Sequence, residues 1–291
     1  MPRLRRSLLF VPGDDERKLD KSHQSAADVL LFDLEDAVVA ARKDRARAAV
    51  AARLRAATSD GPELAVRVNP PGTPAHEDDV DAVVAAGATA LVVPKVVGGD
   101  VLHALAARLD GLDRDGRVAL LALIESPAGL LAAGDWSSWP RRVEAVCYGH
   151  ADFSLAMGLD GADAGEGIAW HARCEVALAA RAADRAPIDT VHLDVRDADG
   201  CRRDARRGRE LGYDGKLCLH PQQVEIVNEV YTPTAAAVAR AREVVEAWAE
   251  AERAGRGVVT VGGTMSDAPL VALQQRVLER AARAAAPRRM T

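Results

Sequence analysis

Eight short apolar runs, separated by polar helical segments, restrict the fold of this chain more than any other feature. The intervening segments, such as "AARKDRARAAVAARLRAA", combine alanine-rich helical periodicity with a charged face. Short strands that alternate with helices predict a parallel sheet, and eight such units in about 230 residues predict an α/β TIM (β/α)8 barrel. A doubly wound sheet is the alternative, although the G-x-G-x-x-G turn of dinucleotide binding does not follow the first run. The predicted strands are Ser7–Val11, Val29–Leu34, Leu64–Val68, Ala90–Val93, Val118–Ile124, Val143–Tyr148, Thr190–Leu193 and Lys216–Leu219.

The pattern changes after Tyr231, so we predict two domains. Residues 1–231 form the barrel, and residues 232–291 form a C-terminal helical extension. The extension begins with a long amphipathic helix and ends with another helix from about Leu270. Between them, "RGVVTVGGTMSDAPL" is interpreted as a glycine-hinged loop that acts as a lid or as an arm onto a neighbouring subunit.

Composition narrows the class of protein. The chain has 291 residues, of which 28% are charged, and its net charge of −5 provides no general basic surface for nucleic acid. Four cysteines without C-x-x-C spacing indicate a reducing compartment and not a zinc site or a disulfide framework. The apolar segment near the N-terminus is too short for a signal peptide, and no run reaches the length of a membrane span. We therefore expect a cytoplasmic enzyme without a membrane or nucleic-acid partner.

Charged residues follow nearly every predicted strand. Glu125 and Asp152 follow neighbouring strands, and Arg67 ends a third. In a TIM barrel the residues just beyond the strands face the active site. Two carboxylates suit Mg²⁺, which leaves its other positions to water and substrate oxygens, and a guanidinium pairs with a substrate carboxylate. The three residues together predict a Mg²⁺ site that binds a 2-oxo acid.

Each of these residues also has a simpler interpretation. Glu125 and Asp152 are each suited to capping the helix that follows, and Arg67 to a structural ion pair. The acids Asp33, Glu35 and Asp36 are too many for one ion, so at least one is expected to pair with Lys95 or Arg67. His150 and His220 are expected to be structural, because Mg²⁺ does not favour imidazole ligands.

Several motifs resemble one known family. The segments are "RSLLFVPG", "LLFDLEDAV", "VRVNP", "VVPKV", "LIESPAGLL", "YGHADFSLAMG" and "GKLCLHPQQV". They are similar to the citrate lyase β-subunit-like family, a part of the Mg²⁺-dependent aldolases and lyases that handle 2-oxo acids on a TIM barrel. Two further segments, "PIDTVHLDVRDADG" and "GGTMSDAPL", most resemble the lyases that act on citramalyl-CoA, malyl-CoA and β-methylmalyl-CoA.

The resemblance implies a set of site residues. Glu125 and Asp152 bind Mg²⁺, Arg67 holds the 2-oxo acid carboxylate, and Asp267 is an acid presented by an adjacent subunit. The catalytic set also includes Glu35 and Asp36, and coenzyme A contacts Phe10, Arg17, Lys21, Ile188 and Asp189. Many relatives have Asn-Arg-Pro after the first Pro-Gly, where this chain has Asp14-Asp15-Glu16. A solvated helix is the alternative for Arg17 and Lys21, and a helix N-cap is the alternative for Asp267.

The expected reaction is reversible carbon–carbon cleavage of a 3-hydroxy-3-carboxy acyl-CoA, which gives acetyl-CoA or propionyl-CoA and pyruvate or glyoxylate. A trimer or hexamer is expected if Asp267 acts on a neighbouring subunit. The alternatives are a malyl-CoA thioesterase, a citrate lyase β subunit acting on an acyl-carrier-protein ester, and a catalytically silent barrel. The sequence does not define the acyl group, because one methyl group in a pocket changes binding by only about 1–3 kcal/mol.

Overall fold

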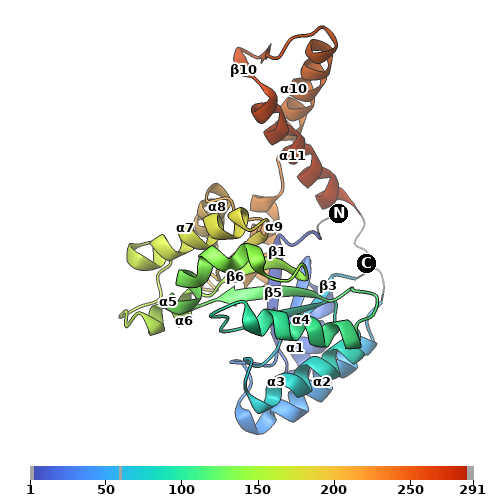
Figure 1. The fold of residues 1–291 in the computed structure, drawn as a ribbon, viewed down its shortest axis with the longest axis vertical. Helices are drawn as coiled ribbons and strands as arrows, with labels where there is room; N and C mark the ends of the chain where they lie inside the picture. Colours follow the sequence, from blue (N-terminus) through green and yellow to red (C-terminus); the bar gives the residue numbers. More distant parts are fainter. Residues whose placement is uncertain (1–2, 59–60, 287–291) are drawn as a thin grey trace. The chain divides into compact units, whose positions relative to one another are not determined.

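A closed barrel of eight parallel strands forms the centre of the protein, as seen over residues 3–58 and 61–286, which the computed structural model describes (Figure 1). Each strand pairs with the next in sequence, and β8 pairs with β1 to close the barrel. The predicted TIM barrel is therefore confirmed. The strands are β1 (Ser7–Pro12), β2 (Val29–Asp33), β3 (Glu63–Arg67), β4 (Ala90–Val93), β5 (Ala119–Ile124), β6 (Val143–Tyr148), β7 (Ala186–Asp189) and β8 (Gly215–Cys218).

Helices connect the strands and cover the outside of the barrel (Figure 1). Short 3-10 helices interrupt three of the connections. The helices of the barrel are α1 (Glu16–Lys21), η1 (Ser22–Gln24), η2 (Ala40–Arg42), α2 (Lys43–Arg55), α3 (Pro74–Ala85), α4 (Asp100–Leu112), α5 (Pro127–Leu131), η3 (Ala132–Ser138), α6 (His150–Ala156), α7 (Gly167–Ala182), α8 (Ala198–Glu210) and α9 (Pro221–Tyr231).

Alternate strand residues fill the barrel interior. Leu8 of β1, Val29 and Leu31 of β2, and Leu121 and Leu123 of β5 belong to one buried apolar cluster. Successive side chains of a strand point to opposite faces, so every second residue faces the barrel axis while its neighbours pack against the helices. Both faces are thus buried, which explains why the strands are continuous apolar runs in the sequence.

The predicted seventh strand, Thr190–Leu193, is wrong. The strand lies four residues earlier, at Ala186–Asp189, and pairs with β6 and β8. Pro187 lies within it and cannot donate a hydrogen bond, and proline is uncommon in the interior of a strand. The β-branched residues that suggested a strand follow β7 instead, at the end of the barrel where they can reach a substrate.

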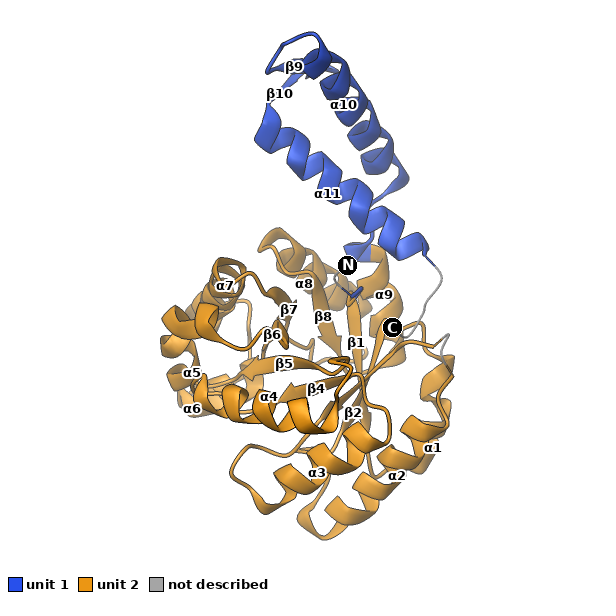
Figure 2. Cartoon of the chain, turned by 45° about the vertical axis from the view of Figure 1, so that its right-hand side comes forward, with its two compact units in different colours: residues 1–4, 230–287 blue, residues 5–229, 288–291 orange. Residues whose placement is uncertain are grey.

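The described chain forms two compact units (Figure 2). One contains residues 5–229, and the other begins at Val230 and includes the N-terminal residues before Arg5. Sequence analysis placed the division after Tyr231, which is the last residue of α9. Residues 1–2, 59–60 and 287–291, which belong to the predicted domains, lie outside the described part of the chain.

The second unit contains two helices joined by a β-hairpin. They are α10 (Ala235–Arg253) and α11 (Ala268–Ala285), and strands β9 (Val259–Val261) and β10 (Thr264–Ser266) pair antiparallel between them. The segment interpreted as a glycine-hinged loop is therefore an ordered hairpin. Gly262 and Gly263 form its turn, and both have positive φ angles, of 55° and 77°. Such two-residue turns match the twist of a hairpin and favour glycine at both positions.

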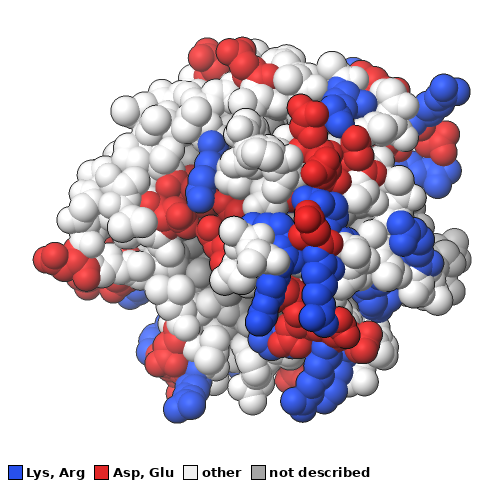
Figure 3. Space-filling model, turned by 90° about the horizontal axis from the view of Figure 1, so that it is seen from below, with Lys and Arg blue, Asp and Glu red and all other residues white. Residues whose placement is uncertain are grey.

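The surface shows no large area of one charge on the face of the molecule in Figure 3, where basic and acidic side chains are interspersed. Among the helices in the described ranges, none is sufficiently long and apolar to cross a lipid bilayer.

Candidate active site

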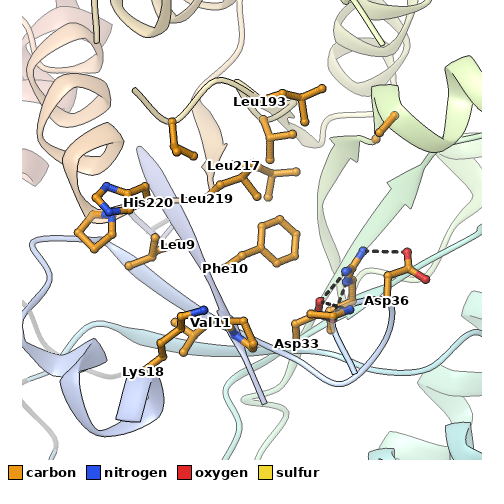
Figure 4. A pocket seen from close by; sticks show the side chains of 18 of the residues that line it. Leu9, Phe10, Val11, Lys18, Asp33, Asp36, Leu193, Leu217, Leu219 and His220 are labelled. Atoms are coloured by element: carbon orange, nitrogen blue, oxygen red, sulfur yellow. Dashed lines mark hydrogen bonds and ion pairs between the residues drawn. The ribbon is translucent and has the colours of Figure 1, made fainter. Parts of the chain in front are cut away.

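A cavity of about 1140 Å³ lies at the carboxyl end of the barrel strands. Its wall includes Arg67, Glu125 and Asp152, so the three residues predicted to bind a metal and a 2-oxo acid share one cavity. The apolar side chains of Leu193, Leu217 and Leu219 gather apart from the acidic ones (Figure 4). The cavity thus combines an acidic region with an apolar wall.

Glu125 is buried at the end of β5, and only 3% of its surface is exposed. Its Oε1 accepts a hydrogen bond of 2.7 Å from the backbone N–H of Lys95. The expected alternative, that Glu125 caps the following helix, does not hold, because Ser126 is the N-cap of α5 and accepts from the N–H of Gly129. The carboxylate of Glu125 is therefore not used as a helix cap, and it lines the cavity.

The negative charges of the carboxylates around Glu125 are not fully balanced by the neighbouring cations. Burial, and then the negative charges of Glu35 and Asp152, raise the pKa of Glu125 from 4.5 to about 8. Burial also raises the pKa of Glu35, although the positive charge of Arg67 acts in the opposite direction. Both oxygens of the Glu35 carboxylate are buried, and Arg67 and Lys95 are their ion-pair partners. A divalent cation would supply the missing positive charge, and oxygen donors suit Mg²⁺.

Asp152 lies in the first turn of α6 and lines the same cavity. The N-cap position belongs to Gly149, and Asp152 does not cap the helix. Over the described ranges, no group of three or more His, Cys, Asp or Glu side chains is arranged to hold a metal ion. Mg²⁺ commonly takes only one or two carboxylates and completes its shell with water and substrate oxygens. Glu125 and Asp152 therefore fit Mg²⁺ better than a metal that needs a full protein cage.

Arg67 makes the ion pairs that its simpler interpretation predicted. Its Nε and Nη2 donate to the two carboxylate oxygens of Asp33 at 2.7 and 2.6 Å, and its Nη1 lies 2.9 Å from Glu35 Oε2. The guanidinium also lies over the ring of Phe10, 4.9 Å from its centroid. These contacts fix the orientation of the arginine, which remains part of the cavity wall.

Of the acids that follow β2, some form ion pairs and some line the cavity. Glu35 does pair with both Arg67 and Lys95, as sequence analysis expected, and the Lys95 ammonium lies 3.1 Å from Glu35 Oε1. Asp36 is half exposed, lines the cavity and lies 3.8 Å from both cations. Asp36 is thus the more accessible of the two acids predicted to be catalytic.

His150 is a structural residue, as expected. Its Nδ1 lies 2.5 Å from Thr190 Oγ1, and its Nε2 lies 3.1 Å from the carbonyl oxygen of Ala162. Burial lowers the pKa of its imidazole below 6.5. The ring therefore joins the exits of β6 and β7 as a neutral hydrogen-bonded group.

The residues expected to contact coenzyme A fall into two groups. Phe10, Arg17 and Lys21 line the cavity, and both basic residues are exposed on α1. Ile188 and Asp189 do not line it, because both lie within β7 and have no exposed surface. Asp189 instead accepts hydrogen bonds from Arg173 and Lys216 inside the protein. The misplaced seventh strand explains this error, and we do not retain these two residues as coenzyme A contacts.

Sequence reasoning missed several residues of the cavity wall, of which three are close to the predicted site residues. Lys18 lies on the same short helix as Arg17 and Lys21, and Thr190 and Val191 follow β7. The basic pattern of α1 was a sufficient signal for Lys18. The other two were assigned to a strand interior and could not be recognised.

Asp267 is the N-cap of α11, in the C-terminal unit. Its Oδ1 accepts a hydrogen bond of 3.3 Å from the N–H of Leu270. This is the alternative that the sequence analysis gave for this acid. A catalytic role of Asp267 on a neighbouring subunit stays a prediction.

Comparison with known proteins decides the family. The sequence model of the HpcH/HpaI aldolase/citrate lyase family matches residues 6–221, which include all eight strands of the barrel and end at the first residue of α9. The chain belongs to this family. The resemblance of the strand-end motifs to citrate lyase β subunits is thereby confirmed.

Three members of the HpcH/HpaI family illustrate the range of activities among its relatives. The citrate lyase subunit β of Haemophilus influenzae is 36% identical over 96% of this chain and 97% of its own length. A (3S)-malyl-CoA thioesterase of Cereibacter sphaeroides is 36% identical over 89% of this chain and 88% of its own length. The structure of CitE from Mycobacterium tuberculosis with magnesium, acetoacetate and coenzyme A has a TM-score of 0.79 at 29% identity, and the match covers 96% of this chain and 99% of that one.

The citrate lyase β subunit matches nearly the full length of this chain, including most of the C-terminal extension. A C-terminal extension of this length therefore does not separate CoA-ester enzymes from carrier-dependent subunits. The length of the chain does not distinguish between these two activities.

Proposed function

We propose that this member of the HpcH/HpaI family is a Mg²⁺-dependent carbon–carbon lyase that reversibly cleaves a 3-hydroxy-3-carboxy acyl-CoA of the citramalyl-CoA or malyl-CoA type. The products would be acetyl-CoA or propionyl-CoA and a 2-oxo acid, either pyruvate or glyoxylate. One observation carries the proposal: Glu125, Asp152 and Arg67 line a single cavity whose wall also contains the basic helix α1. The CitE structure with magnesium, acetoacetate and coenzyme A supports the choice of ligands.

Glu125 and Asp152 are the residues that would hold Mg²⁺. When bound, the ion would act as a Lewis acid toward the hydroxyl and carboxylate oxygens of the substrate. The raised pKa of Glu125, caused by burial and by the negative charges of Glu35 and Asp152, supports a site that takes an additional cation. The same two carboxylates would be poor ligands for a softer metal.

Arg67 would orient the carboxylate of the 2-oxo acid. Asp33 already holds two of its nitrogens, so the guanidinium is fixed before the substrate arrives and little side-chain entropy is lost on binding. The Phe10 ring beneath it limits the approach to one side. Arg17, Lys18 and Lys21 would bind phosphate groups of coenzyme A at the exposed rim of the cavity.

Cleavage breaks the bond between the carbinol carbon and the carbon next to the thioester. The carbinol hydroxyl gives its proton to solvent water, from which Asp267 takes the proton it later donates, and the carbinol becomes the keto group as the bonding electron pair moves to the thioester as an enolate. Protonation of that enolate then gives the acyl-CoA product. We assign this proton transfer to Asp267 of a neighbouring subunit, which would remove the same proton in the reverse reaction. This assignment implies a homo-oligomer, a trimer or a hexamer.

Two relatives favour other outcomes at the same site. The similarity to (3S)-malyl-CoA thioesterase favours hydrolysis of the thioester, which would release free thiol without carbon–carbon cleavage. The similarity to citrate lyase subunit β favours an acyl-carrier-protein ester as the substrate. Each alternative predicts a different product or a different carrier.

The deciding experiment incubates the protein and Mg²⁺ with citramalyl-CoA, malyl-CoA and β-methylmalyl-CoA, and measures 2-oxo acid and free thiol in parallel. We expect 2-oxo acid without an equal amount of thiol. Thiol without 2-oxo acid would establish the thioesterase, and turnover of citryl-acyl carrier protein alone would establish the citrate lyase subunit. Glu125→Gln is the matched control, because it keeps the shape of the side chain but removes a charged metal ligand.

A further inference from the structure

Lys95 has an unusual backbone conformation at the edge of the acidic cluster. It follows β4 and has a positive φ of 55°, a conformation shared among non-glycine residues in the described ranges only by Asp184. The left-handed region is unfavourable for an L-residue with a side chain, because its Cβ approaches the following carbonyl oxygen. A lysine that occupies it must be held there by its surroundings. The hydrogen bond from its N–H to Glu125 Oε1 is one such contact.

The side chain of Lys95 makes a second contact with the same cluster. Its ammonium lies 3.1 Å from Glu35 Oε1 and 3.8 Å from Asp36 Oδ1. The lysine thus links Glu125, which follows β5, to the acids that follow β2. It does not line the cavity, so it reaches the substrate region only through the carboxylates that it contacts.

Negative charges outnumber the positive charges paired with them at this end of the barrel. Five carboxylates stand close to one another or share the cavity, and the cations that form ion pairs with them are Arg67 and Lys95, whereas the basic residues of α1 lie at the exposed rim. Arg67 is committed to Asp33 and Glu35 by close contacts. Lys95 therefore supplies much of the remaining positive charge that keeps the metal-free cluster from repelling itself. The same charge repels any divalent cation that enters between Glu125 and Asp152.

We infer that Lys95 is a positioning residue that stabilises the metal-free acidic cluster and thereby weakens its affinity for Mg²⁺. The inference rests on the proposed binding of Mg²⁺ by Glu125 and Asp152. A site with this internal counter-charge binds the ion reversibly and remains folded without it. Removal of the ammonium alone then tightens Mg²⁺ binding and destabilises the metal-free protein.

The test compares Lys95→Met with Lys95→Arg. Both variants keep a Cβ at position 95, so the backbone strain is the same, and only the first removes the charge. Arg117→Gln is the control for net charge, because Arg117 lies just before β5, at the opposite end of the barrel, and is exposed. The Mg²⁺ dissociation constant is measured by isothermal titration calorimetry with the metal alone, and the melting temperature is measured in EDTA.

We expect Lys95→Met to bind Mg²⁺ about threefold to tenfold more tightly and to melt at a lower temperature in EDTA. Lys95→Arg and Arg117→Gln should bind Mg²⁺ within about twofold of the wild-type protein. Lys95→Gln provides a second neutral side chain should the methionine variant misfold. An unchanged or weaker Mg²⁺ affinity of Lys95→Met, or an unchanged melting temperature in EDTA, overturns this inference but leaves the proposed metal site intact. Failure of the wild-type protein to bind Mg²⁺ overturns the proposed metal site and this inference with it.

Discussion

Gly149 lies directly against Glu125. A Cβ atom at position 149 would be 2.7 Å from the Cβ of Glu125 and 2.9 Å from its Oε2. The N–H of Gly149 also donates to the carbonyl oxygen of Ile124, which fixes the backbone of the glycine beside β5. Neither residue can move away easily, because Glu125 is buried and Gly149 begins α6. Position 149 therefore has no room for a side chain next to the Glu125 carboxylate, which lines the cavity.

Substitution of Gly149 by Ala should displace Glu125 and weaken Mg²⁺ binding by about 10- to 100-fold, the range found when the residues that orient a metal ligand are changed. Calorimetric titration with Mg²⁺ measures the effect, and circular dichroism confirms that the barrel is still folded. Gly111→Ala is the matched control, because a Cβ at that position in α4 meets no atom within 4 Å. Equal Mg²⁺ affinity in the two variants would show that Gly149 does not position Glu125.

The basic residues of α1 should act on coenzyme A binding and not on catalysis. Replacement of Arg17 and Lys21 together by Gln should raise KM for the acyl-CoA substrate by about 30-fold, since each lost charge-assisted hydrogen bond contributes about 1 kcal/mol at an exposed site. The rate constant kcat should stay within about twofold. Steady-state kinetics at two ionic strengths provide the measurement, and the KM of the variant should depend less on salt. Arg55→Gln, an exposed change at the end of α2, serves as the control.

Asp204 should make stability depend on pH at acid values. It bonds Arg173 and Lys216 at 2.7 and 2.6 Å. Burial would raise the pKa of Asp204, but the charges of Lys216 and Arg173 outweigh it and lower the pKa to about 2 from 3.8. The carboxylate therefore stabilises the fold at pH values above about 4, and this contribution disappears as the pH falls to about 2.

The change Asp204→Asn tests this ion network. It should reduce the free energy of unfolding by about 3 kcal/mol at pH 7, because it leaves a buried charge network without one partner. The deficit should shrink as the pH falls toward about 2, where the wild-type carboxylate is also neutral. Urea denaturation at several pH values measures both effects, with the exposed Asp160→Asn as the reference. A deficit that is constant with pH would contradict the ionised state of Asp204.

Asp267 allows its capping role to be separated from its predicted chemistry. Asparagine caps helices about as well as aspartate, so Asp267→Asn should leave the melting temperature nearly unchanged. Loss of the general acid–base group should lower turnover by about 10²- to 10⁴-fold without weakening Mg²⁺ or 2-oxo acid binding. Kinetics and ligand titration of the same preparation make the comparison. Full turnover in the variant would remove Asp267 from the mechanism.

The strand exits were predictable because a parallel barrel buries both faces of every strand. That burial produces continuous apolar runs, and the polar residue that ends each run lies at the carboxyl end of the barrel. Glu125, Asp152 and Arg67 were found in this way, and all three line the cavity. The error at the seventh strand has the same origin. Pro187 interrupts the run, and the β-branched residues that follow it mimic a strand.

The sequence did not predict which charged side chains pair with one another. The sequence showed more acids than one ion needs, but it did not show that Asp33 takes the two nitrogens of Arg67 or that Glu35 lies between two cations. Asp189 was predicted to contact coenzyme A and Lys216 to begin a strand, but the sequence did not show that they form a buried ion network with Arg173. Such pairings depend on distances between residues that are far apart in the chain.

The sequence by itself determined the barrel, the strand ends and the acids and bases that stand there, because apolar periodicity and local polarity are properties of short segments. Only the tertiary structure decided which of those groups meet. The left-handed backbone of Lys95, the space denied to a side chain at Gly149 and the high pKa of Glu125 all arise from contacts between different strands. Electrostatic interaction and steric exclusion act through space, so no local pattern records them.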